Sequence, residues 1–290
     1  MPHFLRLSTR QKVTIARLIN RCVRLGRAAC GKSMQGEFTR GGLKWTLDLN
    51  EGIDLSIYLF GAFERDLVRS YQKLIPAGAT VLDIGANIGT HTLPLAQHVG
   101  PNGHVVAIEA TEYACMKLRK NLSLNPQLVT RAKLVHALLT ASDDATPETA
   151  IQSSWPLVDG EATHDMTCGA LKPVSDARVC RLDTLVNELG LKSVDWIKLD
   201  VDGHELTVLQ GARECLEKYR PGIFMELAPY CYEQNPGSFA EMVSILTANS
   251  YVLSRLPGGK PLPLDPVLLA SEEIPKNGSV NIIARVLNRS

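Results

Sequence analysis

The sequence lacks three features that would each have placed it in a particular class of protein. Its 290 residues include seven cysteines, but no two form a C-x-x-C pair, so neither a zinc knuckle nor a disulfide framework is indicated. No stretch approaches the roughly 18 consecutive apolar residues of a membrane-spanning helix. The N-terminus has no apolar segment typical of a secretory signal. These absences favour a cytoplasmic protein with reduced, buried thiols.

The sequence also lacks a strong net charge. It carries 31 Lys and Arg residues against 30 Asp and Glu residues, a formal net charge of +1, so its overall charge does not indicate a nucleic-acid binder. The average conceals an asymmetry, because residues 1–36 hold eight Lys or Arg residues and no acid, which leaves 23 bases against 30 acids elsewhere. A mildly acidic body with a basic N-terminal arm is predicted, and an acidic body argues against duplex nucleic acid as a partner.

The basic arm contains a predicted amphipathic helix over residues 10–28. The apolar residues that share one face of this helix are Ile15, Leu18, Ile19, Cys22 and Leu25. Arg17, Arg21 and Arg24 share another face. Packing on the body with a solvated basic face is the simplest interpretation. Attachment to an anionic membrane or an acidic partner and a mitochondrial presequence stay open as alternatives.

Strands and helices alternate through the rest of the chain. A short hairpin or extended segment is predicted over 41–58, followed by a helix that aligns Phe63, Leu67, Tyr71 and Leu74. Strands are predicted at 80–84, 105–108, 132–139, 194–199, 223–227, 251–256 and 280–286. Helices are predicted at 91–98, 111–124, 182–189, 206–219 and 239–248. This alternation predicts an α/β fold with a mostly parallel sheet, helices on both faces and an antiparallel edge.

Residues 141–176 interrupt the alternation. They are rich in Ser, Thr, Asp, Pro and Gly. Long loops without secondary structure are uncommon in compact domains and often serve a function. A β-hairpin or a lid is therefore expected in this segment.

The strongest local signal is residues 81–90, VLDIGANIGT. A buried strand runs into a turn that carries Asp83, Gly85, Asn87 and Gly89, and a helix begins after it. Glycine lets a ligand approach the backbone, and a helix N-terminus offers free N–H groups. The dinucleotide pattern G-x-G-x-x-G is absent, and Asp83 would repel a pyrophosphate but attract a cationic amino acid. The motif favours S-adenosylmethionine over NAD.

Charged residues follow three later strands. Glu109 ends a strand 24 positions after Gly85, where a carboxylate can accept hydrogen bonds from ribose hydroxyls. Residues 196–206, WIKLDVDGHEL, bring together Lys198, Asp200, Asp202, His204 and Glu205. Such crowding perturbs pKa values at ligand sites. A helix-capping turn and a metal site of Asp200, Asp202 and Glu205 stay open as alternatives, although no metal is expected. Glu226 closes the next strand at the same edge.

These blocks, in this order, resemble the FkbM family of S-adenosylmethionine-dependent methyltransferases. The matching pieces are residues 52–64, 81–96, Glu109, 181–185, 197–212 and 220–227. Family members commonly carry glutamate at the position of Asp202. The resemblance implies a Rossmann-like seven-stranded sheet over residues 37–290, with 1–36 as a helical extension and 141–176 as a variable insertion or lid. The cofactor-binding residues that it implies are Asp83, Gly85, Ala86, Asn87, Gly89, Thr90, Glu109, Ala110 and Asp200.

The resemblance also implies a reaction, the methylation of a hydroxyl group on a sugar, glycolipid or polyketide. A hydroxyl is a poor nucleophile at pH 7, so a general base is expected. His204 is the first candidate, because histidine exchanges protons near neutral pH, and Asp200 and Glu226 are alternatives. Lys198 would orient Asp200 or the acceptor oxygen.

Several alternatives stay open on sequence alone. Glu64 is a further candidate for an active-site acid, and Tyr58 for the wall of the same pocket. The expected partner is a small-molecule or glycan hydroxyl acceptor, with membrane contact through the basic helix and no nucleic acid. The competing functions are an N-methyltransferase of a protein or small molecule, an NAD-dependent oxidoreductase and a noncatalytic module that binds S-adenosylmethionine.

Overall fold

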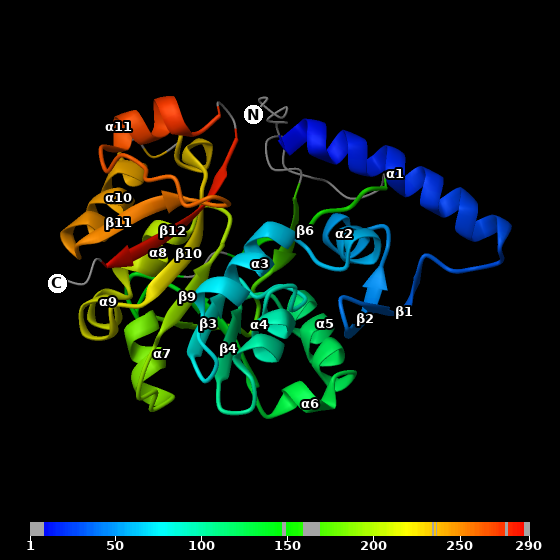
Figure 1. Ribbon diagram of the computed structural model, residues 1–290, viewed down its shortest axis with the longest axis horizontal. Helices are drawn as coiled ribbons and strands as arrows, with labels where there is room; N and C mark the ends of the chain where they lie inside the picture. Colours follow the sequence, from blue (N-terminus) through cyan, green and yellow to red (C-terminus); the bar gives the residue numbers. More distant parts are fainter. Residues whose placement is uncertain are drawn as a thin grey trace.

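An eight-stranded sheet forms the centre of the molecule (Figure 1). The computed structural model describes residues 9–146, 149–158, 169–233, 235, 237–275 and 278–286. The strands of this sheet are β3 (Thr80–Ile84), β4 (His104–Glu109), β5 (Ala132–Leu139), β8 (Arg178–Cys180), β9 (Trp196–Leu199), β10 (Gly222–Leu227), β11 (Tyr251–Arg255) and β12 (Val280–Val286). Their spatial order is β11-β12-β10-β9-β3-β4-β5-β8.

The predicted α/β fold class is confirmed. The strands from β10 to β8 run parallel, and β12 pairs antiparallel with both β10 and β11, which is the predicted antiparallel edge. The sheet has eight strands rather than seven, because the three-residue strand β8 adds to β5. The order of strands reverses between β3 and β9, so a crevice is expected at their carboxyl ends.

Helices cover both faces of the sheet (Figure 1). The α-helices between residues 52 and 268 are α2 (Gly52–Phe60), α3 (Arg65–Leu74), α4 (Thr92–Val99), α5 (Glu112–Ser123), α6 (Pro126–Val129), α7 (Leu182–Glu188), α8 (Glu205–Gln210), α9 (Arg213–Tyr219), α10 (Ser238–Ala248) and α11 (Pro266–Leu268). Successive strand residues point to opposite faces. Accordingly, Val81 and Leu82 of β3 belong to two different buried apolar clusters, one for each face.

Two segments fold differently from the sequence prediction. The hairpin consists of β1 (Gln35–Arg40) and β2 (Leu43–Asp48), so it begins before the predicted segment 41–58, and residues 52–58 of that segment belong to α2. The predicted helix 206–219 is divided into α8 and α9. The division falls at Gly211, where a Cβ atom would lie 2.2 Å from the carbonyl oxygen of Thr140. A contact with a distant segment therefore overrides the helical periodicity.

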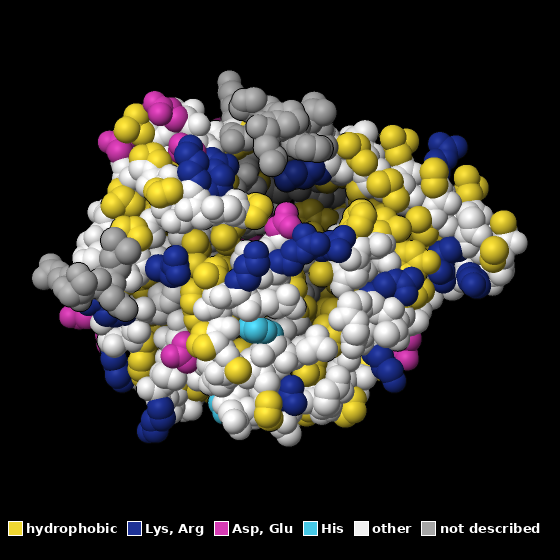
Figure 2. Space-filling view, viewed as in Figure 1, with side chains coloured by type: hydrophobic (Ala, Val, Ile, Leu, Met, Phe, Trp, Pro, Cys, Tyr) yellow, Lys and Arg dark blue, Asp and Glu magenta, His cyan; other side chains and the backbone are white. Residues whose placement is uncertain are grey.

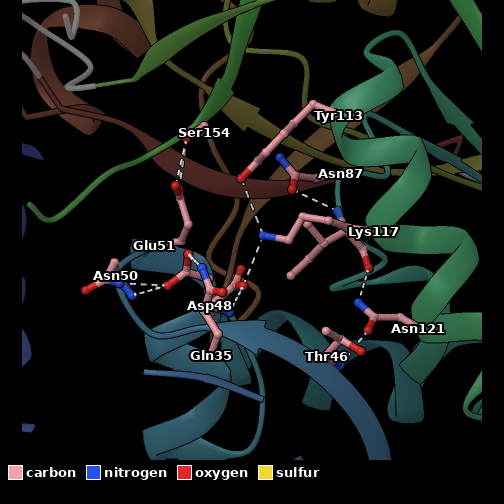
Figure 3. Close-up of polar contacts among 12 residues, drawn as sticks. Gln35, Thr46, Asp48, Asn50, Glu51, Asn87, Tyr113, Lys117, Asn121 and Ser154 are labelled. Carbon is pink, nitrogen blue, oxygen red and sulfur yellow. Dashed lines mark hydrogen bonds and ion pairs between the residues drawn. The ribbon is translucent and has the colours of Figure 1, made fainter. Parts of the chain in front are cut away.

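A pair of strands lies in the irregular segment 141–176, as predicted. The strands β6 (Ala150–Ser154) and β7 (Ala170–Pro173) run antiparallel, and residues 159–168 between them lie outside the described part of the chain. The carboxylate of Glu51 attaches β6 to the body, because it accepts hydrogen bonds from the Ser154 hydroxyl at 3.0 Å and the Trp155 N–H at 2.9 Å. Figure 3 shows Glu51 pointing toward Ser154.

The N-terminal helix α1 spans Thr9–Ala29 and packs along one side of the molecule (Figure 1). Its inner face contributes Ala16, Ile19 and Val23 to the apolar cluster beneath it, and the Asn20 amide donates a hydrogen bond to the Leu49 carbonyl at 2.6 Å. The apolar face predicted from the sequence is only partly covered. Leu18 and Leu25 are 62% and 65% exposed.

The cysteines differ from expectation in part. All six in the described residues are free thiols, and Cys115, Cys180 and Cys215 are buried as predicted. Cys22 and Cys30 are exposed, because they lie on the outer side and at the end of α1. Within the described ranges, none of the helices combines the length and the apolarity needed to cross a membrane.

A buried ion pair joins the β1–β2 hairpin and α2 to the Rossmann-like body. The Lys117 ammonium lies 3.0 Å from the Asp54 carboxylate, which also accepts the Asp48 N–H at 2.7 Å. Figure 3 shows Lys117 reaching from α5 into this group of polar side chains. Burial raises the pKa of Asp54 to about 6, although Lys117 opposes the shift.

Replacing Lys117 with methionine is expected to lower the free energy of unfolding by about 3 kcal/mol at pH 8, because Asp54 becomes a buried charge without a partner. The loss should shrink at pH 5, where a carboxyl group with a raised pKa takes up a proton and becomes neutral. Urea unfolding at the two pH values measures both effects. Lys120→Met on the same helix is the control, because Lys120 and its partner Glu37 are both about half exposed. Equal losses in the two variants would contradict the prediction.

Candidate active site

Two adjoining cavities open at the carboxyl ends of β3, β4, β9 and β10. The first, called the small pocket below, has a volume of about 60 Å³. Its lining includes Gly85, Asn87, Ile108, Glu109, Ala110, Leu138, Leu139, Ile151, Ser153, Trp155, Asp200, Asp202, His204 and Val208. The second, called the large cavity, has a volume of about 560 Å³. Its lining includes Ile15, Ile19, Ile53, Leu59, Phe60, Phe63, Glu64, Thr90, Lys198, Asp200, Asp202, Glu226, Tyr230 and Ser279.

The two cavities share part of their walls. The residues that line both are Gly85, Asn87, Trp155, Asp200 and Asp202. We call this shared wall the junction. A group bound in the small pocket would meet a group bound in the large cavity at the junction, which is the geometry that a transfer reaction requires.

The turn after β3 is packed directly against the loop after β9. Gly85 adopts a φ of +79°, and a Cβ atom at this position would lie 1.8 Å from the backbone carbonyl oxygen of Asp200. The N–H groups of Gly85 and Ala86 both donate to the Ile108 carbonyl at the end of β4, at 3.0 and 3.1 Å. A glycine is therefore required where the ends of the three strands converge.

Glu109 lies at the end of β4 in the small pocket and is buried. Its carboxylate accepts hydrogen bonds from the Asn87 N–H at 2.9 Å and from the N–H and hydroxyl of Thr111 at 2.9 and 2.8 Å. Burial raises the pKa of Glu109, although these hydrogen bonds oppose the shift. The Thr111 hydroxyl also contacts the Ser153 hydroxyl at 2.8 Å, which connects β6 to this network.

Lys198 is a buried cation at the centre of the site. Its ammonium lies 3.1 Å from the Asp200 carboxylate and 3.9 Å from that of Asp83. Burial alone would lower the pKa of Lys198, but Asp200, Asp83 and Glu64 outweigh burial and raise it. Asp83 accepts the Thr92 hydroxyl at 2.6 Å through one oxygen, and its other oxygen has no hydrogen-bond donor among the described residues.

Glu226 and Asp202 form the acidic end of the large cavity. Glu226 lies on β10 and accepts a hydrogen bond from the Ser279 hydroxyl. Burial, reinforced by the nearby charges of Asp200 and Glu64, raises the pKa of Glu226 to about 8. Burial and the charge of Asp200 also raise the pKa of Asp202. Glu226 can therefore hold a proton near neutral pH.

Glu64 faces the same space from the start of α3. Burial would raise the pKa of Glu64, but contacts with His91 at 3.4 Å and the Asn281 amide at 2.7 Å outweigh it and lower the pKa. The backbone of Glu64 is left-handed, with a φ of +46°, and Asn87 and Asp202 have φ values of +47° and +49°. Non-glycine residues in this conformation often mark functional sites, and all three line the large cavity.

The structure brings most of the predicted site residues together. Those in the small pocket are Gly85, Asn87, Glu109, Ala110, Asp200 and His204. Those in the large cavity, besides the shared Gly85, Asn87 and Asp200, are Glu64, Thr90, Lys198 and Glu226. Asp83, on β3, and Ala86 and Gly89, in the turn after it, are outside both linings.

Two further candidates have structural contacts elsewhere. Tyr58 packs against Phe38 and the Arg40 guanidinium. Glu205, which the metal interpretation would have used, is buried and accepts hydrogen bonds from the Tyr232 hydroxyl at 2.6 Å and the Gly203 N–H at 3.2 Å. Glu205 therefore stabilises the turn before α8, as the helix-capping alternative predicted.

The sequence analysis missed the apolar wall of the large cavity. The side chains of α1 and α2 in this wall, such as Ile15 and Leu59, are separated from the β3 turn by many residues. Trp155 at the junction was also missed, because it lies in the irregular segment. The amphipathic character of α1 was visible in the sequence, but periodicity does not identify the surface that a helix face meets.

Comparisons with known proteins identify a methyltransferase family. A family model described as methyltransferase FkbM domain matches residues 83–253, more than half of the chain. Methyltransferase sdnD of Sordaria araneosa is 26% identical over 204 residues, which cover 58% of this chain and 77% of that protein. Methyltransferase FkbM from Methylobacillus flagellatus KT has 15% identity and a TM-score of 0.47, over 77% of this chain and 48% of that chain. A SAM-dependent methyltransferase from Aquifex aeolicus has 15% identity and a TM-score of 0.43, over 81% and 95%.

Proposed function

The chain belongs to the FkbM family of S-adenosylmethionine-dependent methyltransferases, and from this premise we propose that it methylates a hydroxyl group of a small-molecule or glycan acceptor. The acceptor class is a sugar, a glycolipid or a polyketide-type compound. The cofactor occupies the small pocket, and the acceptor occupies the large cavity. The observation that supports this arrangement is the junction, where the two cavities meet beside Asp200.

The residues of the small pocket suit the cofactor chemically. The buried Glu109 carboxylate can accept hydrogen bonds from ribose hydroxyls, and Ile108, Leu139 and Val208 offer apolar contact to an adenine ring. Asp200 at the junction suits the cationic methionine part. Bound there, S-adenosylmethionine supplies a methyl group that its sulfonium already activates.

The small pocket has a smaller volume than the cofactor requires. Sites for ligands of this size measure about 300 Å³ or more, whereas the pocket measures about 60 Å³. Ile151 and Ser153 of β6, with the neighbouring Trp155, form its outer wall. Outward movement of β6 would enlarge the pocket, and it would break the contact between Ser153 and Thr111.

We assign the role of general base to Glu226. Its carboxylate lines the large cavity and its pKa is about 8, so the deprotonated form that can accept a proton becomes more abundant as pH rises from neutral toward 8. Glu226 takes the proton of the acceptor hydroxyl as the oxygen bonds to the methyl carbon and the bond from carbon to sulfur breaks. Lys198 holds Asp200 in place at the junction. His204 lies in the small pocket, so its role is on the cofactor side.

The proposed reaction is tested with methyl-labelled S-adenosylmethionine and pairs of acceptors that differ only in the nucleophile, such as alkyl glucosides and the corresponding amino sugars. We expect label in the glucosides, in a product that resists mild alkali because an ether is not hydrolysed. Transfer only to the amino sugars would contradict O-methylation and support the N-methyltransferase alternative. Cofactor binding with no label in any acceptor, and no S-adenosylhomocysteine formed, would support a noncatalytic module.

A further inference from the structure

The large cavity is lined by charged side chains in one part and by mostly apolar side chains in another. At one end lie Lys198 and the carboxylates of Glu64, Asp200, Asp202 and Glu226. The part of the wall that α1, α2 and the segment after α2 supply is mostly apolar, with Ile15, Ile19, Ile53, Leu59, Phe60 and Phe63, and it includes one cation, Lys12 of α1. Figure 2 shows hydrophobic side chains along α1 and around the hollow beside it. A ligand that fills this cavity must itself be polar at one end and apolar at the other.

The apolar end opens at the surface of the molecule. Ile15 is 43% exposed, and Leu59 and Phe60 of α2 are 39% and 55% exposed. Large exposed apolar side chains that adjoin a cavity mark a binding site more often than an ordinary surface. An apolar chain that extends from the acidic end would leave the cavity between α1 and α2 and would cover these side chains.

Helix α1 carries a second exposed feature outside the cavity. Leu18, Cys22 and Leu25 follow one another at helical spacing and form an exposed apolar stripe, which continues to Ile15 at the wall of the cavity. Arg17, Arg21 and Arg24 form an exposed basic stripe beside it, and residues 9–29 contain no acid. An apolar face flanked by cationic side chains is typical of a helix that lies in the plane of an anionic lipid surface.

We propose that the acceptor is a hydroxylated amphiphile with a long apolar chain, and that α1 lies on the anionic lipid surface from which the amphiphile is taken. Its hydroxyl group lies beside Asp200 and Glu226, and its chain lies between α1 and α2. This inference rests on the proposed function and names the acceptor class for the same site. A polar acceptor without such a chain would leave the apolar end of the cavity uncovered.

Chain binding is tested without methyl transfer. The full chain is saturated with S-adenosylhomocysteine and titrated with methyl, hexyl and octyl β-glucoside below their micellar concentrations. Each methylene that the cavity buries should tighten binding about fourfold. Leu59→Glu should flatten this dependence, because a carboxylate would lie along the path of the chain. Val267→Glu is the matched control, since Val267 is 72% exposed and lies on α11, outside the lining.

Two results would overturn the chain-binding part: equal affinity for methyl and octyl glucoside, or the same chain-length dependence in Leu59→Glu as in the unmodified protein. Other outcomes would refute the proposed function without affecting the chain-binding part, or the reverse. Chain-length dependence without turnover on any hydroxyl acceptor would refute O-methylation only. Turnover on methyl glucoside without chain-length dependence would refute the amphiphile only.

The lipid surface is tested by co-sedimentation with vesicles. We expect the protein to bind phosphatidylcholine vesicles that contain phosphatidylglycerol and to bind pure phosphatidylcholine at least tenfold more weakly. Leu18→Glu combined with Leu25→Glu should reduce binding to the anionic vesicles at least tenfold. Met116→Glu combined with Val129→Glu, which places the same charge at two exposed apolar positions on α5 and α6, should not. Absence of binding to anionic vesicles, or unchanged binding by the α1 variant, would overturn this part of the proposal.

Discussion

Replacing Gly85 with alanine is expected to abolish binding of S-adenosylmethionine. The φ of Gly85 is +79°, and its added Cβ atom would lie 1.8 Å from the carbonyl oxygen of Asp200. Because the obstructing atom belongs to the backbone, no side-chain rotation relieves the clash, and the β3 turn must separate from the loop after β9. That separation disrupts the junction of the two cavities. Calorimetric titration should show a loss of affinity of at least 100-fold.

Gly78→Ala separates the effect of the clash from that of backbone conformation. Gly78 has a φ of +85°, and no atom lies within 4 Å of its added Cβ. The strain of a left-handed alanine should cost about 1 kcal/mol of stability in this variant, but cofactor affinity should not change. Circular dichroism shows whether both variants are folded. Equal cofactor affinity in the two variants would refute the role assigned to the β3 turn.

Glu226→Gln is expected to reduce turnover by about 10² to 10⁴, the range typical of general-base removal, with little change in cofactor affinity. The unmodified enzyme should become more active as pH rises toward the Glu226 pKa of about 8, because only the deprotonated carboxylate accepts a proton. Below that pKa the rate should fall tenfold for each pH unit. The variant should lose this rising limb. Initial rates between pH 5.5 and 9.5, measured with a saturating acceptor, test both expectations.

His204→Ala distinguishes the two candidate bases. Because His204 lies in the small pocket, its replacement should weaken cofactor binding more than it lowers the maximal rate. A variant that binds the cofactor normally but loses turnover, together with an active Glu226→Gln variant, would assign the base to His204 instead. The pH profile of the remaining activity supplies a second comparison.

Glu226 should also affect stability, with a sign that follows from its pKa. The ordinary pKa of glutamate is 4.5, and that of Glu226 in the folded protein is about 8. Between these values the folded chain holds a proton that the unfolded chain releases, so the contribution of Glu226 to stability is lost as pH rises from about 4.5 to 8. Glu226→Gln should therefore be more stable than the unmodified protein at pH 8.5. Urea unfolding at pH 6 and 8.5 measures the difference.

The local sequence pattern was sufficient to predict most strands of the sheet. The strands β3, β4 and β10 are short apolar runs with a glycine or an acid at or next to their carboxyl end, and the amphipathic helices around them have clear periodicity. It was not sufficient for residues 206–219, where the pattern is continuous but Gly211 packs against Thr140 and divides the helix. The strand β8 was missed because a three-residue strand is too short to show alternation.

The α/β class, the glycine turn at Gly85 and the acids that end the strands all follow from the order of residues, because each depends on neighbours in the chain. The shape of the acceptor cavity does not. Its apolar wall comes from α1 and α2, and apart from Glu64 its acidic end comes from the loop after β9 and from β10, more than 100 residues away. Periodicity identifies an apolar face, but packing between distant segments determines what that face covers, and here part of it covers a cavity rather than the core.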